Sequence, residues 1–407
     1  MSIFLKNNIV NENFFVKYSC PIDSNEESII NIPLILNIAP VIWALNLEFY
    51  VNEIDSNLYN SLSHIKEELK LNYPDLNWDG KIHYKKQINN LDNTSKISSK
   101  NIFFSGGIDS FFTFFSIISK NNRLILVRGA DIKLDDDDGW FEVKRMVNNI
   151  KLNYNVKTEF IETNLITFLN SDKLNYISGN INDWWSRVQH GPGFAALVAP
   201  INKNYCESYI SATHSKDFST AWGSSPKIDN LIRYSNHKII HFGYDHTRQQ
   251  KIKEIIKLIT NNKFHKPVLR VCYKNKNIGS KNCCNCEKCF RTITGIIIAG
   301  SSPKDFGFKI SINETYLRLK KTLENNEIVF DENRLFMWQD IQKHIENLPE
   351  PYSSENRDKF VKWFKNFDFD NYLLKNYRKT TTLNNIYQIL KQYSFGRFVI
   401  RSYKAIK

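Results

Sequence analysis

Short apolar runs alternate with longer segments of helical period through the middle of the chain. The runs cover residues 102–104, 124–127, 158–161, 208–212 and 238–242. Helices are expected from Asp109, over residues 140–150, after Pro192, and over residues 246–260 with Asp245 as the N-cap. This alternation is typical of a parallel sheet with crossover helices, so we expect an α/β domain built on five strands.

The segments on either side of this pattern differ from it. Residues 1–95 carry short apolar stretches broken by Asn, Asp, Pro and Gly, and the polar stretch 89–100 after them predicts a linker. Beyond Gly300 the chain is polar and of helical period, with aromatic anchors at Phe336, Trp338, Trp363 and Phe364. We therefore expect an N-terminal small domain (1–95), a central domain (100–305) and a helical C-terminal region (306–407).

Composition places the chain among globular proteins. Hydrophobic residues make up 42% and charged residues 24% of its 407 positions. The longest apolar run, residues 32–45, is interrupted by two prolines and one asparagine and is shorter than the roughly 18–20 residues of a membrane span. The first residues show no basic region followed by an apolar stretch, so we expect a cytoplasmic protein without a secretory signal.

The net charge of +13 is concentrated near the end of the chain. No acidic residue follows Asp370, and Tyr and Phe alternate with Lys and Arg in the basic tail, residues 371–407. Such a segment is able to bind single-stranded RNA by stacking and phosphate contacts, or to lie on an anionic membrane as an amphipathic helix. The third interpretation is that its apolar face docks on the body of the same chain.

Two glycines separate an expected strand from an expected apolar helix in what we call the glycine loop: Ser105, Gly106, Gly107, Ile108, Asp109 and Ser110. Glycine permits a tight turn and close approach of a ligand, and N–H groups at a helix start favour a pyrophosphate. The two serine hydroxyls add donors, and Asp109 is expected to hold Mg²⁺ against the phosphate oxygens. The Walker pattern is absent. The alternative is an ordinary strand-to-helix turn capped by Ser and Asp.

Five of the seven cysteines fall within 18 positions. Cys272, Cys283, Cys286 and Cys289 have the spacing C-x10-C-x2-C-x2-C, which predicts a closed tetrahedral Zn²⁺ site with a structural role. Cys284 adjoins a ligand, and a register that uses it in place of Cys283 is the less favoured alternative. A four-thiolate iron–sulfur cluster is a further alternative.

These two motifs together resemble the 7-cyano-7-deazaguanine synthases of the PP-loop ATP pyrophosphatase superfamily. The resemblance covers about residues 100–302 and rests on FFSGGIDSFFT and on LRVCYKNKNIGSKNCCNCEKCFRTITGIIIAG. It implies a nucleotide-hydrolase-like α/β fold, ATP at the glycine loop, and Mg²⁺-dependent attack of a carboxylate or amide oxygen on the α-phosphorus with release of pyrophosphate. The stretches at 182–194 and 211–233 depart from the synthase pattern, which indicates a divergent branch with a different substrate.

Further candidate residues lie near the expected carboxyl ends of the strands, where ligands of open α/β folds bind. Arg128 follows the second strand and is a candidate for the nucleotide, with a surface cation as the alternative. The run Asp135 to Asp138 is interpreted as a solvated helix start rather than a metal site. The candidates for substrate contact are Trp185, Arg187, His190, His214, Lys216, Asp217, Ser224 and Ser225.

The expected activity is ATP-dependent adenylation of a carboxylate or amide on a small molecule, followed by ligation or amidation. Ser105, Asp109 and Ser110 are the expected catalytic residues. One alternative is modification of RNA. Another is a defence or regulatory module that senses a nucleotide and binds or modifies a partner protein. A homodimer is a further expectation.

Overall fold

The computed structural model describes residues 9–22, 26–91, 100–130, 132–179, 181–202, 207–218, 220–272, 282–345 and 354–375. Most of the expected linker and of the basic tail lies outside these ranges. The RNA, membrane and docking interpretations of residues 371–407 therefore remain predictions.

A seven-stranded sheet forms the centre of the molecule, in the order β1-β6-β5-β4-β7-β9-β8. Its five inner strands are parallel and coincide with the expected runs: β4 (Lys100–Phe103), β5 (Arg123–Arg128), β6 (Lys157–Thr163), β7 (Glu207–Ser211) and β9 (His237–Phe242). The two edge strands, β1 (Val16–Tyr18) and β8 (Arg233–Tyr234), pair antiparallel with their neighbours. The α/β class with a mostly parallel sheet is confirmed, whereas the nucleotide-hydrolase-like fold remains a prediction.

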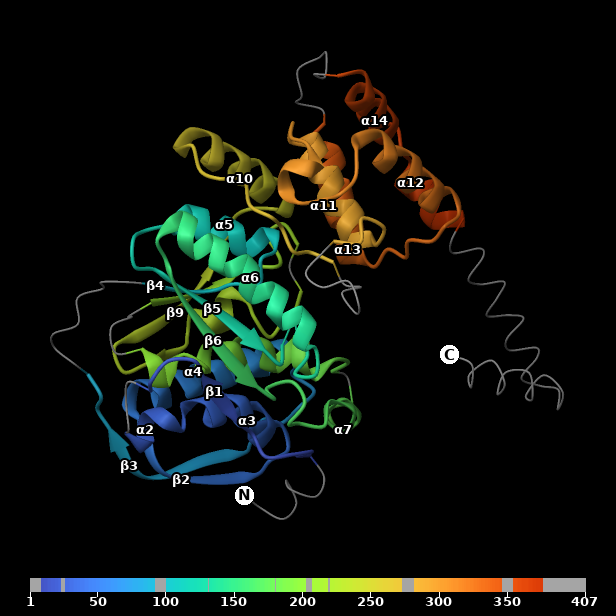
Figure 1. Ribbon diagram of the computed structural model, residues 1–407. Helices are drawn as coiled ribbons and strands as arrows, with labels where there is room; N and C mark the ends of the chain where they lie inside the picture. Colours follow the sequence, from blue (N-terminus) through green and yellow to red (C-terminus); the bar gives the residue numbers. More distant parts are fainter. Residues whose placement is uncertain are drawn as a thin grey trace, which may run out of the picture.

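Apolar side chains project from both faces of this sheet. Helices cover each face (Figure 1). Ile102, Leu124 and Leu126 share one core with α5 (Ile108–Ile117), α6 (Asp137–Tyr154) and α10 (Arg248–Asn262). Phe103 and Ile125, which point the other way, share a second core with α3 (Ile32–Ala44), α4 (Ser56–Asn72) and α8 (His190–Ala196). Alternate strand residues point to opposite faces, and the near-continuous apolar runs reflect burial on both.

Helix starts follow local capping chemistry. Asp136 accepts a hydrogen bond from the amide of Gly139 and caps α6, which confirms the helix-start interpretation of the acidic run at 135–138. The expectation that Asp245 caps α10 is wrong. Thr247 is the cap, because its hydroxyl and the Gln250 amide oxygen each accept from the other residue's backbone N–H.

The N-terminal part contributes a layer below the sheet in Figure 1. It contains α2 (Glu27–Ile30), α3, α4, and a parallel pair of strands, β2 (Glu48–Asp55) and β3 (Lys81–Ile88). The apolar run at residues 32–45 forms the buried helix α3, with Pro40 inside it. In the described part of the chain, no helix combines the length and apolarity needed to cross a membrane.

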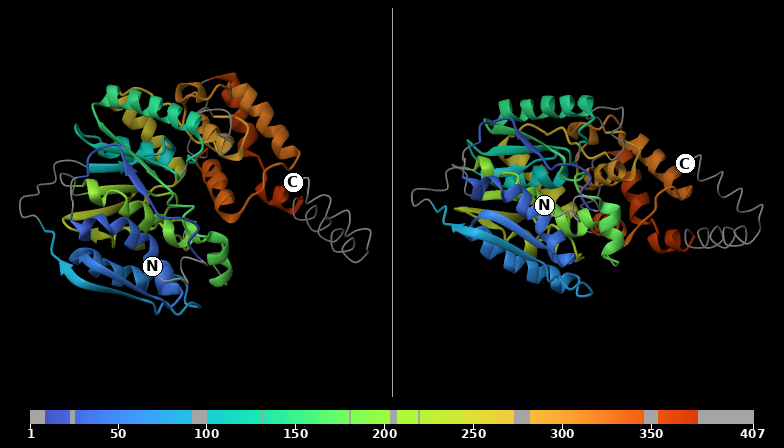
Figure 2. Two further views of the ribbon diagram at one scale, coloured as in Figure 1. Left: turned by 60° about the horizontal axis from the view of Figure 1, so that its bottom comes forward. Right: turned by 90° about the horizontal axis from the view of Figure 1, so that it is seen from below.

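The C-terminal helices lie at one end of the sheet, away from β2 and β3 (Figure 2). They are α11 (Glu287–Ile298), α12 (Ile312–Glu324), α13 (Glu332–Lys343) and α14 (Glu355–Lys365). Of the expected aromatic anchors, Trp338 and Phe364 are fully buried, and Phe336 lies 5.3 Å from the ring of Phe218. The core of these helices is continuous with the core around α5.

The remaining helical elements are short. They are α7 (Ser171–Ile177), the π-helical turn Trp185–Gln189 that leads into α8, the 3-10 turns Ala199–Ile201 and Pro303–Phe306, and α9 (Pro226–Asp229). Residues 369–375 are also helical.

Candidate functional site

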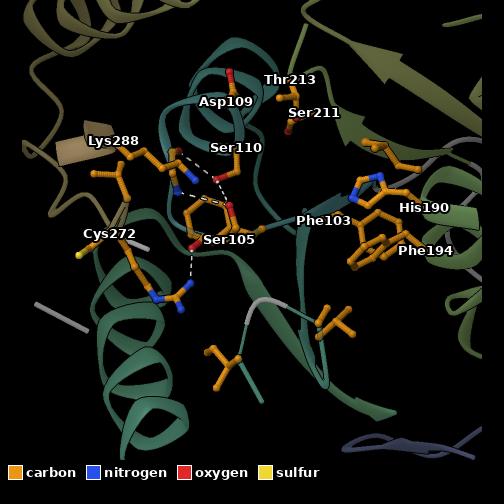
Figure 3. Close-up of a pocket in the computed structure, with 18 of the residues that line it drawn as sticks. Phe103, Ser105, Asp109, Ser110, His190, Phe194, Ser211, Thr213, Cys272 and Lys288 are labelled. Atoms are coloured by element: carbon orange, nitrogen blue, oxygen red, sulfur yellow. Dashed lines mark hydrogen bonds between the residues drawn. The ribbon is translucent and has the colours of Figure 1, made fainter. Parts of the chain in front are cut away.

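The carboxyl end of β4 is the point at which the strand order reverses. Strand β5 lies on one side of β4 and β7 on the other, because the chain runs from β4 outward to β5 and β6 and then crosses back to β7 on the opposite side of β4. Such reversals leave a crevice at the carboxyl ends of the strands. A cavity of about 480 Å³ lies there, and the glycine loop forms part of its wall (Figure 3).

The glycine loop joins β4 to α5 with the tight turn that its sequence predicts. Gly106 has a φ of +79°, and a Cβ at this position would lie 2.8 Å from the terminal methyl of Met146, so only glycine fits without strain. Gly107 is the N-cap of α5, and its carbonyl accepts a 3.1 Å hydrogen bond from the Ser110 hydroxyl. Ser105 Oγ lies 3.4 Å from Ser110 Oγ and from the Gly107 amide nitrogen.

Four of the six loop residues line the cavity. They are Ser105, Gly107, Asp109 and Ser110. The side chain of Ile108 belongs to the core that α5 shares with the sheet, and Gly106 is buried. The nucleotide contacts expected at Gly106 and Ile108 are therefore restricted to their backbone atoms.

Asp109 is held between two cations. Its Oδ2 lies 2.6 Å from Nη1 of Arg248, and its Oδ1 lies 3.1 Å from Nζ of Lys251. Burial raises the pKa of Asp109, but Lys251 and Arg248 outweigh it and lower this pKa from 3.8 to about 2. Asp109 is thus ionised and fully paired.

Further cations line the cavity. Arg270 and Lys288 line the cavity together with Arg248, Arg291 and Arg334. The guanidinium of Arg270 donates to the carbonyl of Ser105 at 3.5 Å, and Lys288 lies on the opposite side of Ser105 from Phe103 (Figure 3). Arginine and lysine donors grouped beside helix-start N–H groups form an environment that suits phosphate oxygens.

The apolar lining of the cavity comes from both cores. Some lining residues are members of the α5–α6 core, among them Leu126, Trp140 and Val143. Others belong to or pack against the second core, namely Phe103, Phe194, Ile125 and Ile210, and Figure 3 shows Phe103 and Phe194 together with His190. A ligand held at the loop therefore has apolar surface available in the same cavity.

His190 is the one candidate substrate residue that lines this cavity among the described residues. Trp185 packs edge-on against His190, with ring centroids 5.4 Å apart. It does not line the cavity itself but supports the His190 ring that does. Arg187 is half-buried and does not line the cavity; its carbonyl accepts from the hydroxyl of Tyr73. The neighbouring Trp184 is a core residue stacked on Trp78.

Ser224 and Ser225 belong to a turn that packs against residues 186–191 rather than to the cavity wall. The amide of Gly191 donates to the carbonyl of Gly223 at 3.0 Å. The hydroxyl of Ser224 donates to the buried carboxylate of Asp229 at 2.7 Å, and Ser225 is the N-cap of α9. Nδ1 of His241 lies 2.8 Å from the same Asp229 oxygen. These serines support the turn that carries His190.

The segment after β7 presents different residues from those expected. Ser211 and Thr213 line the cavity, whereas Lys216 and Asp217 are exposed outside it. His214 packs between Phe218 and Trp222. Burial is the main cause that lowers the pKa of His214, Asp109 opposes this shift, and His241 and Lys251 add to it, so the imidazole is neutral at pH 7.

Arg128 has its guanidinium committed elsewhere. It pairs with Asp137 and with Glu162 at 3.2 Å, and it donates to the carbonyl of Leu134 at 2.6 Å. It is not among the residues that line the cavity. Its contacts stabilise the connection between β5 and α6.

The four expected cysteine ligands converge on one point, which we call the cysteine cluster: Cys272, Cys283, Cys286 and Cys289. Their sulfur atoms all lie within 4.8 Å of one another. Two pairs are separated by 3.9 Å and 3.8 Å, close to the edge of about 3.8 Å for a tetrahedron with Zn–S bonds of about 2.3 Å. Cys284 has a φ of +54° and directs its thiol to the carbonyl of Asn282, so the register through Cys283 is confirmed. The donor set fits Zn²⁺.

Comparisons with known proteins give no further assignment, since no family model, curated protein or solved structure matches this chain. The resemblance to the PP-loop synthases therefore remains a prediction that rests on the two motifs.

Several residues in and around the cavity were not predicted from the sequence. Arg270 and Lys288 flank or separate cysteine ligands, and this closeness to the second motif is a signal that could have found them. Arg248 and Lys251 lie 139 and 142 positions after Asp109, and no local pattern pairs them with it. Asn333 and Arg334 belong to α13, in a region for which the sequence predicted only helices.

Proposed function

We propose that this protein binds ATP at the glycine loop and adenylates a carboxylate or amide oxygen of a small molecule, as in the PP-loop enzymes that its motifs resemble. The observation that carries the proposal is the position of the loop. Ser105, Gly107 and Ser110 line a cavity at the switch point of a parallel sheet, beside the cations Arg248, Arg270 and Lys288.

The residues supply what such a reaction requires. The α5 start and the cations balance the charge of the triphosphate and of the transition state. The acceptor oxygen forms a bond to the α-phosphorus, the bond from the α-phosphorus to the bridging oxygen breaks, and pyrophosphate leaves with that electron pair. The apolar lining of the cavity offers surface for the adenine and for the acceptor.

The cysteine cluster would hold Zn²⁺ in a closed four-thiolate shell, which leaves no position for a substrate. In this proposal the metal supports the fold around Arg270 and Lys288 and supplies no chemistry. Both oxygens of Asp109 are occupied by Arg248 and Lys251, so Asp109 does not fit the expected role of Mg²⁺ ligand.

The test is acceptor-dependent pyrophosphate release and ATP–pyrophosphate exchange with pools of carboxylates and primary amides. Lys288→Met, which keeps the length of the side chain and removes its charge, is expected to lower exchange at least about tenfold. Lys257→Met is the matched control, since Lys257 is exposed on α10 and pairs only with Glu254 among the described residues. Nucleotide binding without pyrophosphate release from any pool would favour the sensor alternative. Absence of nucleotide binding would remove the whole assignment.

A further inference from the structure

Asp109 lies where α5, α10 and the end of β7 come together. It projects from the first turn of α5, and both cations that contact it lie in the first turn of α10. Lys251 also donates to the carbonyl of Ala212, directly after β7, at 2.5 Å. Asp109 therefore ties α10 to the glycine loop, and Lys251 ties α10 to the end of the neighbouring strand.

The two cations occupy a position that is unfavourable without a counter-ion. The N-terminus of a helix carries a partial positive charge, which disfavours Arg248 and Lys251 in the first turn of α10. Lys251 is also 1% exposed, and burial disfavours its charged form. Asp109 opposes both effects, because its carboxylate accepts a hydrogen bond from each of the two side chains.

The same contacts conflict with a metal on Asp109. Mg²⁺ requires near-octahedral oxygen ligands at about 2.0–2.1 Å, and it would have to share this carboxylate with two cations. Both carboxylate oxygens already accept from Arg248 and Lys251. A divalent ion added there would be repelled by two adjacent positive charges.

On the basis of the proposed nucleotide site, we infer that Asp109 is the counter-ion that places Arg248 against the triphosphate, and that it does not bind Mg²⁺. Arg248 lines the cavity, whereas Lys251 is buried behind it. Nη1 of Arg248 donates to Asp109, and within the described ranges no other hydrogen bond of this guanidinium is found. Arg248 thus has donors left for a phosphate, and Asp109 positions it.

The binding test measures the Kd for ATP by calorimetry in excess Mg²⁺ and in buffer without Mg²⁺, with no chelator added, because a chelator would also remove a metal from the cysteine cluster. Arg248→Met is expected to weaken binding at least about tenfold in both media, because a phosphate contact is lost with or without the metal. Asp109→Asn is expected to change both Kd values by the same factor, which leaves their ratio within about twofold of wild type. Lys257→Met again serves as the control and should match wild type.

A second measurement reports on Asp109 without any nucleotide. Asp109→Asn leaves the buried Lys251 without its counter-ion and is expected to lower the midpoint of urea unfolding. Adding Lys251→Met removes the second charge as well and should recover most of that loss. This cycle also shows whether the single variant is folded well enough for the binding test.

The outcomes separate the inference from the proposed function. If Asp109→Asn abolishes the difference between buffers with and without Mg²⁺, Asp109 is a metal ligand and the inference is wrong, while the nucleotide site stands. If Arg248→Met binds ATP as wild type does, Arg248 is not the phosphate contact and the inference is also wrong. If wild type binds ATP in neither medium, the proposed function fails, and the urea cycle still decides whether Asp109 is a counter-ion.

Discussion

The backbone amide of Arg270 donates a 2.8 Å hydrogen bond to the carbonyl of Gly106, and this bond connects the cysteine cluster to the glycine loop. Arg270 precedes the first ligand, Cys272, by two residues. The side chain of Asn282 holds the same segment from the other end, since it accepts from the amide of Val271 and donates to the carbonyl of Leu269. The geometry of the loop therefore depends on the segment that the cluster organises.

Loss of the metal should weaken nucleotide binding. Cys286→Ala removes one ligand, so the segment at 269–272 loses its anchor and Arg270 is no longer held against Gly106. We expect the metal content, measured by plasma mass spectrometry, to fall from about one ion per chain. The affinity for ATP, measured by calorimetry, should fall with it.

Cys284→Ala is the matched control for this loss. Cys284 adjoins a ligand, but its thiol points to the carbonyl of Asn282 rather than into the cluster. Its metal content and its ATP affinity should equal those of wild type. A Cys284→Ala protein that loses metal, or a Cys286→Ala protein that keeps it, would contradict the ligand set.

Gly106→Ala should destabilise the protein through both backbone strain and a steric contact. The φ of +79° disfavours any residue with a Cβ, and that Cβ would lie 2.8 Å from the Met146 methyl. Gly179→Ala isolates the first effect, because Gly179 has a φ of +65° and no atom within 4 Å of the added Cβ. We expect about 1 kcal/mol for Gly179→Ala and a larger loss for Gly106→Ala in urea unfolding. Equal losses would show that Met146 moves aside.

The sequence predicted the parts of the structure that local chemistry controls. Patterns within short segments predicted the five parallel strands, the glycine turn and the cluster of four cysteines. Each is found where it was expected. The strand β1, three residues long, carries too little pattern to be predicted, and its position is set by pairing with β6 across the sheet.

The cavity residues show where local pattern stops being informative. Thr213 and Ser211 line the cavity while Lys216 and Asp217, a few positions on, do not, because the chain turns away after β7. Arg128 has the right position at a strand end, but Asp137 and Glu162 bind its guanidinium. Such choices depend on which distant groups meet a side chain, and that is decided by tertiary packing.

Asp109 should make the free energy of unfolding depend on pH. Its pKa is lowered from 3.8 to about 2 in the folded protein, so its contribution is fully present above pH 4 and is lost as the pH falls through about 2. The loss corresponds to about 2 kcal/mol by linkage. Urea unfolding of wild type and Asp109→Asn at several pH values between about 5 and 2 measures it. The difference between the two proteins should shrink toward low pH, and a constant difference would contradict the pKa shift.

Asp229→Asn should destabilise the turn that carries His190. The Asp229 carboxylate is fully buried, lies within hydrogen-bond distance of Ser224 and His241, and packs so closely on Gly191 that a Cβ there would lie 2.0 Å from its oxygen. We expect a loss of about 2–3 kcal/mol in the free energy of unfolding. Asp217→Asn, at an exposed position, is the control and should change stability by less than about 0.5 kcal/mol. An Asp229→Asn variant with unchanged stability would show that one of the two hydrogen bonds is enough to hold the turn.

The core that runs without interruption from α5 to α14 affects how the chain can be divided. Glu287 on α11 accepts from both Arg291 and the indole of Trp338 on α13, so the two helices share one half-buried polar contact. A truncation after residue 305 would strip this contact and remove the packing of α12 and α13 against the apolar, largely buried helix α11. Expression of the central part alone should yield aggregates, and the smallest soluble unit with an intact cavity should extend through α14.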